Sequence, residues 1–343
     1  MSLTNDSETT FAYKERLKDK RIDLAESIPL SGPLSVHIEP TNICNFKCKC
    51  CPQSFSNYKE KAGGFFQLSM DDFEIIANQL STLPPVKQLN LFLMGEPFVN
   101  KELINFIKVA KDKNLSKCYM VSSNGVLLTS EKYQSLCESG LDFLRISIFG
   151  SNEEIHSNIT QSKIKLSKVK ENIENFQKFK SLNGFSKPRT LVKMIDTENA
   201  ESNEEFISDF TGLGDETFLE PLTNWNDPVE GNLSKKNKSD LMLTQHYQRK
   251  KKVCSYPFYS LIIHSDLQVS VCCVDWEKKA LIGDLRRETL IEIWNGEKLR
   301  NIQLKHIQGK KSELEGCKNC TYIHTAIDNI DALDEKTFLS RLK

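Results

Sequence analysis

Two groups of cysteines are the residues of this sequence that most directly indicate chemistry. Four of the eleven cysteines fall within "CNFKCKCC", residues 44–51, and another pair lies in "GCKNC", residues 316–320. Cys44, Cys48 and Cys51 have the spacing C-x3-C-x2-C, which brings three thiolates from one loop to a metal and leaves a fourth position open unless Cys50 fills it. Structural zinc sites usually pair two separated C-x2-C units, and no second unit lies nearby. The spacing therefore favours an iron–sulfur cluster over zinc.

The composition indicates a globular protein. Of 343 residues, 39% are hydrophobic and 27% charged, and 46 Lys and Arg balance 46 Asp and Glu, so no basic surface predicts nucleic-acid binding. The sequence contains no run of about 18 apolar residues, the length that would predict a membrane span. The polar N-terminus lacks the apolar stretch of a signal peptide. We expect a cytoplasmic protein, in which clustered cysteines are ligands or catalysts rather than disulfides.

Strand-like segments alternate with helical patterns over residues 34–221. The strand segments are 34–39, 87–93, 117–122, 142–149, 189–195 and 216–221. This alternation predicts a parallel sheet with right-handed crossovers. Six units are too few for a complete eight-stranded barrel, so we predict an α/β fold with a partial (β/α)6 barrel, whose active site lies at the carboxyl ends of the strands. The first cysteine loop lies directly after strand one, at that end.

The rest of the chain divides into three segments: a polar extension without chemistry of its own (1–33), a linker or bridging region (222–253) and a second unit (254–343). In this unit "SLIIHSDLQVSVCC" predicts a β-hairpin that turns at Ser265–Asp266. An amphipathic helical stretch over 288–307 follows it.

The segment "IEPTNICNFKCKCCP" resembles the radical S-adenosylmethionine (radical SAM) enzymes, because its three cysteines directly follow the first strand. In that family the three cysteines hold a [4Fe–4S] cluster, and the fourth iron binds the amino and carboxylate groups of S-adenosylmethionine. The residue before the last cysteine is commonly aromatic in the family and is Cys50 here. This departure changes one packing expectation but not the implied ligands.

Further segments at consecutive strand ends match the family's cofactor site. "LMGEP" (93–97) resembles its glycine–glutamate motif, in which glycine lets carbonyls approach the ammonium of S-adenosylmethionine and glutamate supplies an acceptor and charge. "SSNG" (122–125) resembles a Thr-Asn-Gly-like segment, and the serine of "RISIFG" matches one that meets the ribose or carboxylate. The implied cofactor-binding residues are Gly95, Glu96, Pro97, Ser123, Asn124 and Ser147.

The second unit resembles the C-terminal SPASM extension of these enzymes, or its shorter form, twitch. The shared features are a Cys-x-x-Pro-like opening, a hairpin that ends in Cys-Cys-x-Asp, "GDL", "EIWN" and a closing C-x2-C. The resemblance implies an α+β unit that holds one auxiliary [4Fe–4S] cluster, and so two clusters in the chain. The implied ligands are Cys254, Cys272, Cys317 and Cys320, with Cys272 favoured over Cys273 by its spacing from the turn. Four ligands close the cluster, which suits electron transfer or structural support.

The resemblance implies that a reduced first cluster cleaves S-adenosylmethionine and that the resulting 5′-deoxyadenosyl radical takes hydrogen from a C–H bond of the substrate. We expect a small-molecule substrate and a flavodoxin or ferredoxin as reductant. The leading hypothesis is dehydrogenation of a sugar or aminocyclitol, with epimerisation as a close variant. Weak catalytic candidates are the thiols Cys50 and Cys273, as hydrogen donors, and Asp275, as a base.

Two other functions remain open from the sequence. Modification of a ribosomally made peptide is common among SPASM enzymes, but many of these carry a long N-terminal recognition domain, and only about 33 residues precede the first strand here. A non-catalytic iron–sulfur carrier is the third hypothesis. The Gly-Glu-Pro element argues against it, because a carrier needs no nucleotide site.

Overall fold

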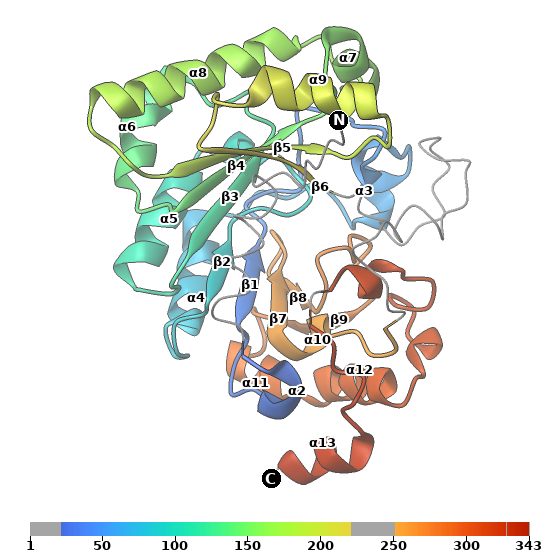
Figure 1. The fold of residues 1–343 in the computed structure, drawn as a ribbon. Helices are drawn as coiled ribbons and strands as arrows, with labels where there is room; N and C mark the ends of the chain where they lie inside the picture. The colour runs from blue at the N-terminus through green and yellow to red at the C-terminus, as the bar shows by residue number, and fades with distance from the viewer. Residues whose placement is uncertain (1–21, 221–250, 327, 343) are drawn as a thin grey trace.

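A single curved sheet of nine strands runs through the protein in the computed structural model, which describes residues 22–220, 251–326 and 328–342 (Figure 1). The strand order is β6-β5-β4-β3-β2-β1-β7-β8-β9. The strands are β1 (Ser35–Ile38), β2 (Gln88–Asn90), β3 (Tyr119–Ser123), β4 (Phe143–Ile148), β5 (Arg189–Ile195), β6 (Glu216–Glu220), β7 (Ser260–Ile263), β8 (Gln268–Ser270) and β9 (Leu281–Asp284).

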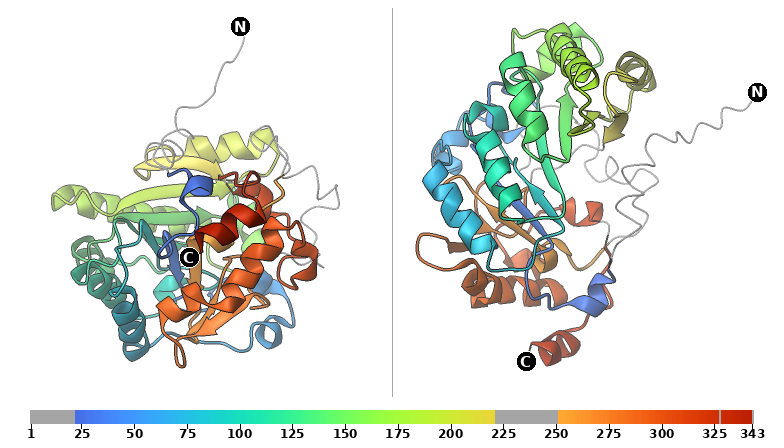
Figure 2. Two further views of the ribbon diagram at one scale, coloured as in Figure 1. Left: turned by 90° about the horizontal axis from the view of Figure 1, so that it is seen from below. Right: turned by 90° about the vertical axis from the view of Figure 1, so that its left-hand side faces the viewer.

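Helices connect the parallel strands and cover one side of the sheet. In Figure 1 and in the right-hand view of Figure 2, α4, α5, α6 and α8 lie along the same side. The helices are α2 (Leu24–Ser27), α3 (Tyr58–Lys61), α4 (Met70–Leu80), α5 (Leu103–Asp112), α6 (Ser130–Glu138), α7 (Glu153–Thr160), α8 (Leu166–Leu182), α9 (Ala200–Phe210), α10 (Tyr256–Tyr259), α11 (Leu290–Asn295), α12 (Glu297–Ile307) and α13 (Glu335–Arg341), with 3-10 turns η1 (Pro52–Ser54), η2 (Pro97–Val99), η3 (Lys311–Glu313) and η4 (Tyr322–Thr325).

The predicted α/β fold is confirmed. Strands β1 to β6 pair in chain order and all run parallel, as six consecutive βα units require. Side chains alternate across the sheet, so Val36 and Ile38 of β1 pack with helix residues such as Phe73 and Phe106 in the main core. Residues of the opposite phase face the other side of the sheet.

The second unit shares the sheet of the barrel. β7 pairs parallel with β1, and β8 and β9 then add antiparallel strands. The predicted hairpin is present as β7 and β8, but β9 was not predicted, because it is short and contains Gly283. Helix α11 packs so closely on that glycine that an added Cβ would lie 2.4 Å from Ile293 Cγ1.

The helical stretch predicted over 288–307 is two helices, α11 and α12. Gly296 separates them with extended backbone, φ −74° and ψ 159°. The predicted linker lies outside the described residues except at 251–253, and so does the N-terminal extension up to residue 21. No helix in the described ranges combines the length and the apolar composition that crossing a bilayer needs.

The described end of the N-terminal extension packs against the C-terminal unit. Leu24 and Ile28 of the α2 region form a buried cluster with Phe258, Ile330 and Phe338. The α13 guanidinium of Arg341 donates hydrogen bonds to backbone carbonyls of this segment, the shortest at 2.7 Å. This segment therefore helps to hold the second unit in place, a contribution that its polar sequence did not indicate.

Candidate active site

Hydrogen bonds fix the first cysteine loop, residues 44–51, on both flanks. On one flank the amides of Lys47 and Lys49 donate to carbonyls at the end of α7, at 3.1 and 2.9 Å. On the other, the buried side chain of Gln53 donates to a carbonyl before the loop and to one in the 93–97 segment, at 2.7 and 3.1 Å. The loop is therefore tied to the cofactor motif by Gln53, a residue that the sequence did not single out.

The thiols of Cys44, Cys48 and Cys51 lie within electrostatic reach of one another. Burial raises the pKa of Cys44 to about 11 and raises the pKa of Cys48 and Cys51 further, and the neighbouring thiols of the loop add to this for the last two. Buried thiols so close together ionise only when positive charge compensates them, which is what bound iron supplies. This donor set fits an iron–sulfur cluster.

Glu96 connects the ends of β2 and β3. One carboxylate oxygen accepts from Ser123 Oγ at 2.8 Å and from the Phe98 amide at 3.2 Å, and the other accepts from the Asn124 amide at 2.7 Å. Burial raises the pKa of Glu96 to about 7, although these hydrogen bonds favour the carboxylate. The structure thus brings together residues that the sequence placed on separate strand ends.

This network reaches the first cysteine through Asn45. The side-chain amide of Asn124 donates to Asn45 Oδ1 at 2.7 Å, and the Cys44 thiol approaches the same oxygen at 3.9 Å. Ser147, by contrast, lies on β4 opposite Lys193 of β5 and outside this network. Ser147 directly follows Ile146, the partner of Ser123 in the sheet, and its role in cofactor binding stays a prediction.

Gly95 allows two backbone segments to approach closely. An added Cβ would lie 2.2 Å from the Thr41 carbonyl oxygen and 2.6 Å from that of Ile43. The amide of Glu96 also donates to the Ile43 carbonyl at 2.9 Å. Gly95 therefore sets the distance between the cofactor motif and the first cysteine loop.

Replacement of Gly95 by alanine is expected to lower the free energy of unfolding of the iron-free protein by about 3 kcal/mol, because backbone atoms on both sides must move. Urea unfolding measures this loss, and iron retention should fall with it. Gly32→Ala is the matched control, since its Cβ would meet only Leu83 methyls at 3.8 Å. Equal losses in the two variants would contradict the role of this close approach.

The second cysteine set lies around a hollow in the C-terminal unit, which we call the second hollow. Its lining includes Cys254, Cys272, Cys317 and Cys320, the four cysteines predicted as auxiliary ligands. Cys254 lies just before α10, Cys272 lies just after β8, and Cys317 and Cys320 lie in the loop after η3. In that loop the Lys311 ammonium donates to the carbonyls of Cys317 and Cys320, at 3.3 and 2.9 Å. Four thiols around one hollow fit a second cluster.

The thiols of the adjacent Cys272 and Cys273 contact each other but have different further surroundings. Cys272 lines the hollow, whereas the Cys273 thiol lies 3.5 Å from the Tyr322 hydroxyl. Asp275 also lines the hollow, but its two oxygens accept from the amides of Lys279 and Ala280, at 2.9 and 2.7 Å. Both acceptors are thus engaged in closing a loop, which weakens the hypothesis that Asp275 is a base.

No group of three or more His, Cys, Asp or Glu in the described ranges has the geometry to hold a single metal ion. In an iron–sulfur cluster each thiolate binds a separate iron, so the ligands need not converge on one atom.

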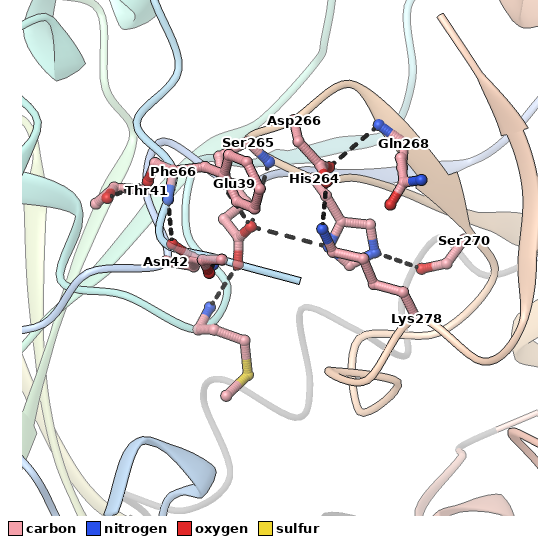
Figure 3. A network of polar contacts seen from close by, with 12 residues as sticks. Glu39, Thr41, Asn42, Phe66, His264, Ser265, Asp266, Gln268, Ser270 and Lys278 are labelled. Atoms are coloured by element: carbon pink, nitrogen blue, oxygen red, sulfur yellow. Dashed lines mark hydrogen bonds and ion pairs between the residues drawn. The ribbon is translucent and has the colours of Figure 1, made fainter. Parts of the chain in front are cut away.

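A buried network around Glu39 connects the 93–97 segment to the turn of the β7–β8 hairpin (Figure 3). Glu39, at the end of β1, accepts from the Met94 amide at 3.3 Å and from the Ser265 amide and hydroxyl at 3.2 and 2.9 Å. His264 Nδ1 lies 3.8 Å from the same carboxylate, and its other ring nitrogen lies 2.9 Å from Ser270 Oγ. Burial opposes ionisation of Glu39, but His264 and Ser265 hold its pKa below the usual value. The hairpin turn is thereby fixed to the cofactor motif.

Charged side chains lie on the other face of the sheet. Arg145, Lys193 and Glu220 each lie two residues beyond an apolar residue of a small cluster that includes Leu191 and Phe218, so they share its face. Glu220 pairs with Lys193 at 2.5 Å and with Arg145 at 3.4 Å. Burial opposes its ionisation, but these two cations lower the pKa of Glu220 to about 2.

This charged group lies between the two cysteine sets. The charge of Lys193 acts on the thiol of Cys50 in the first loop, and the charge of Arg145 acts on the thiol of Cys273 beside the second hollow. The side chains of Arg145, Lys193 and Glu220 are 15%, 12% and 31% exposed. None of the three belongs to a predicted motif, although their common phase on adjacent strands was a usable signal.

A sheet whose first six strands are parallel, with three cysteines after its first strand and four more around the second hollow, has the features of an iron–sulfur protein with two cluster sites. The model of the radical SAM superfamily matches residues 38–207, and SPASM, an iron–sulfur cluster-binding domain, matches residues 254–321. The chain belongs to the radical SAM superfamily and carries a C-terminal SPASM domain. Its cofactors are [4Fe–4S] clusters and S-adenosylmethionine.

Two relatives align over most of the chain. A tungsten-containing aldehyde ferredoxin oxidoreductase cofactor-modifying protein from Pyrococcus furiosus is 24% identical over 298 residues, 77% of this chain and 81% of that protein. An S-adenosyl-L-methionine-dependent 2-deoxy-scyllo-inosamine dehydrogenase from Niallia circulans is 19% identical over 289 residues, 84% and 92%. The PqqA peptide cyclase of Rhodopseudomonas palustris is 32% identical, but over only 36% of this chain and 30% of its own length.

Solved structures share the fold. BtrN in complex with AdoMet and 2-DOIA has a TM-score of 0.56 at 16% identity, covering 87% of this chain and 94% of that chain. Streptococcus suis SuiB bound to the precursor peptide SuiA has a TM-score of 0.64 at 14% identity, covering 97% and 82%. At these identities the likeness shows a common fold.

Proposed function

We propose that this protein is a radical SAM oxidoreductase that dehydrogenates a polar small molecule, a sugar or an aminocyclitol, at a carbinol carbon. The observation that carries the proposal is the set of four cysteines around the second hollow. Four protein ligands would close an auxiliary cluster, so that it serves electron transfer rather than substrate binding. In this proposal Cys44, Cys48 and Cys51 hold the first cluster, and Cys254, Cys272, Cys317 and Cys320 hold the second.

When bound, the first cluster and S-adenosylmethionine supply hydrogen-atom abstraction, and the auxiliary cluster supplies an electron acceptor. Oxidation of a carbinol to a ketone removes one hydrogen atom, one proton and one electron. The first site would take the hydrogen atom, the auxiliary cluster the electron and water the proton, which balances the reaction. The residues of this chain orient the substrate. Arg145, Lys193 and Glu220 offer two cations and a carboxylate between the two sites, and these suit the hydroxyl, amino or anionic groups of a polar substrate.

A sequence relative named for a small-molecule substrate supports the proposal, whereas the fold is shared both by BtrN and by SuiB bound to a precursor peptide. The inosamine dehydrogenase aligns with 84% of this chain and 92% of its own length, whereas the peptide cyclase aligns with 36% and 30%. We also propose a cytoplasmic location and reduction by a flavodoxin or ferredoxin, since thiolate-bound clusters suit a reducing compartment.

The test uses 2-deoxy-scyllo-inosamine and related polyols with the reconstituted, reduced enzyme in deuterated water. We expect formation of 5′-deoxyadenosine to rise about tenfold over the uncoupled rate, a barrier change of about 1.4 kcal/mol. A ketone without solvent deuterium at the reacting carbon should accumulate. One deuterium at an inverted centre, lost in Cys50→Ala or Cys273→Ala, would instead establish epimerisation. Turnover of a precursor peptide alone would favour peptide modification.

A further inference from the structure

His306 is a buried histidine with unused hydrogen-bonding capacity. It lies in the last turn of α12 with only 2% of its surface exposed. Both ring nitrogens lack a hydrogen-bond partner in the part of the chain that the structure describes. Leaving such a group unsatisfied costs about 1–3 kcal/mol, so a partner is expected where the ring lies.

The ring lies at the second hollow. His306 lines it together with Cys254, Cys272, Cys317 and Cys320. The other polar side chains of the lining are engaged. The Lys311 ammonium donates to two carbonyls of the closing cysteine loop, the Asp275 carboxylate accepts from two amides, and the Tyr322 hydroxyl accepts from Tyr256 and Cys273. His306 is therefore the side chain that faces the cysteines with a donor to spare.

The imidazole of His306 is a hydrogen-bond donor in either protonation state, because it carries at least one N–H. In a hollow lined by four thiols, the available acceptor is sulfur.

We propose that His306 donates an N–H···S hydrogen bond to the auxiliary cluster or its cysteine sulfurs and thereby raises the reduction potential of that cluster. The inference rests on the proposed auxiliary cluster. Hydrogen bonds to the sulfurs are one of the factors that set the potential of such clusters. A donor stabilises the reduced form more than the oxidised form, because reduction places more negative charge on the sulfurs. His306 is thus a positioning and tuning residue for the electron acceptor.

The experiment uses the full chain with Cys44, Cys48 and Cys51 replaced by alanine, so that the auxiliary cluster is the one measured. In this background His306→Leu is expected to lower the equilibrium constant for one-electron reduction about tenfold, equivalent to about 59 mV. An EPR-monitored redox titration measures the shift. His306→Gln, which retains an N–H donor, should recover most of it, and the imidazole nitrogen and exchangeable-proton couplings should disappear in His306→Leu.

His156→Leu is the matched control, because this histidine is equally buried but belongs to α7 and packs on Phe46 of the first loop. The auxiliary potential should not change in it. An unchanged potential and unchanged proton coupling in His306→Leu, with about four irons still bound, would overturn the inference. If His306→Leu loses its iron, the decision rests on the parent variant that retains His306. Absence of an imidazole nitrogen coupling in that parent would contradict the inference. A parent without iron would refute the proposed auxiliary cluster instead.

Discussion

Replacement of Cys44, Cys48 and Cys51 by alanine is expected to abolish cleavage of S-adenosylmethionine and to leave about four of about eight irons per chain. The three thiols lie in one buried loop, and their raised pKa values show that they ionise there only with a compensating positive charge. The four cysteines of the second hollow lie in a different part of the chain. One cluster should therefore be lost while the other stays.

Iron analysis and the formation of 5′-deoxyadenosine under reducing conditions provide the two measurements. Cys118→Ala is the control, because Cys118 lies at the start of β3, away from both cysteine sets, and should retain both clusters. One equivalent of zinc with little iron in the parent protein would contradict the assignment of both sites. Full iron content in the triple variant would contradict the ligand assignment alone.

The second large effect is expected at Cys272. Cys272→Ala should lose about four irons and all substrate oxidation, while uncoupled cleavage of S-adenosylmethionine continues at the first site. Cys273→Ala should keep both clusters, because the Cys273 thiol lies at the Tyr322 hydroxyl and does not line the hollow. Cys272→Ala and Cys273→Ala are thus matched variants, because they replace adjacent residues at the end of the same β-hairpin.

Iron content, the EPR spectrum of the reduced protein and uncoupled cleavage distinguish the outcomes. Iron loss in Cys273→Ala but not in Cys272→Ala would reverse the ligand assignment. Loss of uncoupled cleavage in Cys272→Ala would show that the two sites are not independent. The Glu39 network, which fixes the hairpin turn to the 93–97 segment, is the path through which such a dependence would arise.

The sequence by itself determined the order of the parallel strands and the position of the first cysteine loop. Both follow from local patterns: alternation within 34–39 and 189–195 predicts strands, and the spacing of Cys44, Cys48 and Cys51 lies within one loop. In a parallel sheet of βα units, consecutive strand ends meet at one edge. The proximity of Glu96 to Ser123 and Asn124 could therefore be expected before the fold was known.

Only the tertiary structure decided what depends on contacts between distant segments. Glu39 and Ser265 are 226 positions apart and meet because β7 pairs with β1, which no local pattern indicated. The choice of Cys272 over Cys273 as a lining residue, and the orientation of His306 toward that hollow, depend on how α12 and the hairpin pack. A side chain's spacing along the chain is set by covalent geometry, whereas its partner across the molecule is set by the packing of whole elements.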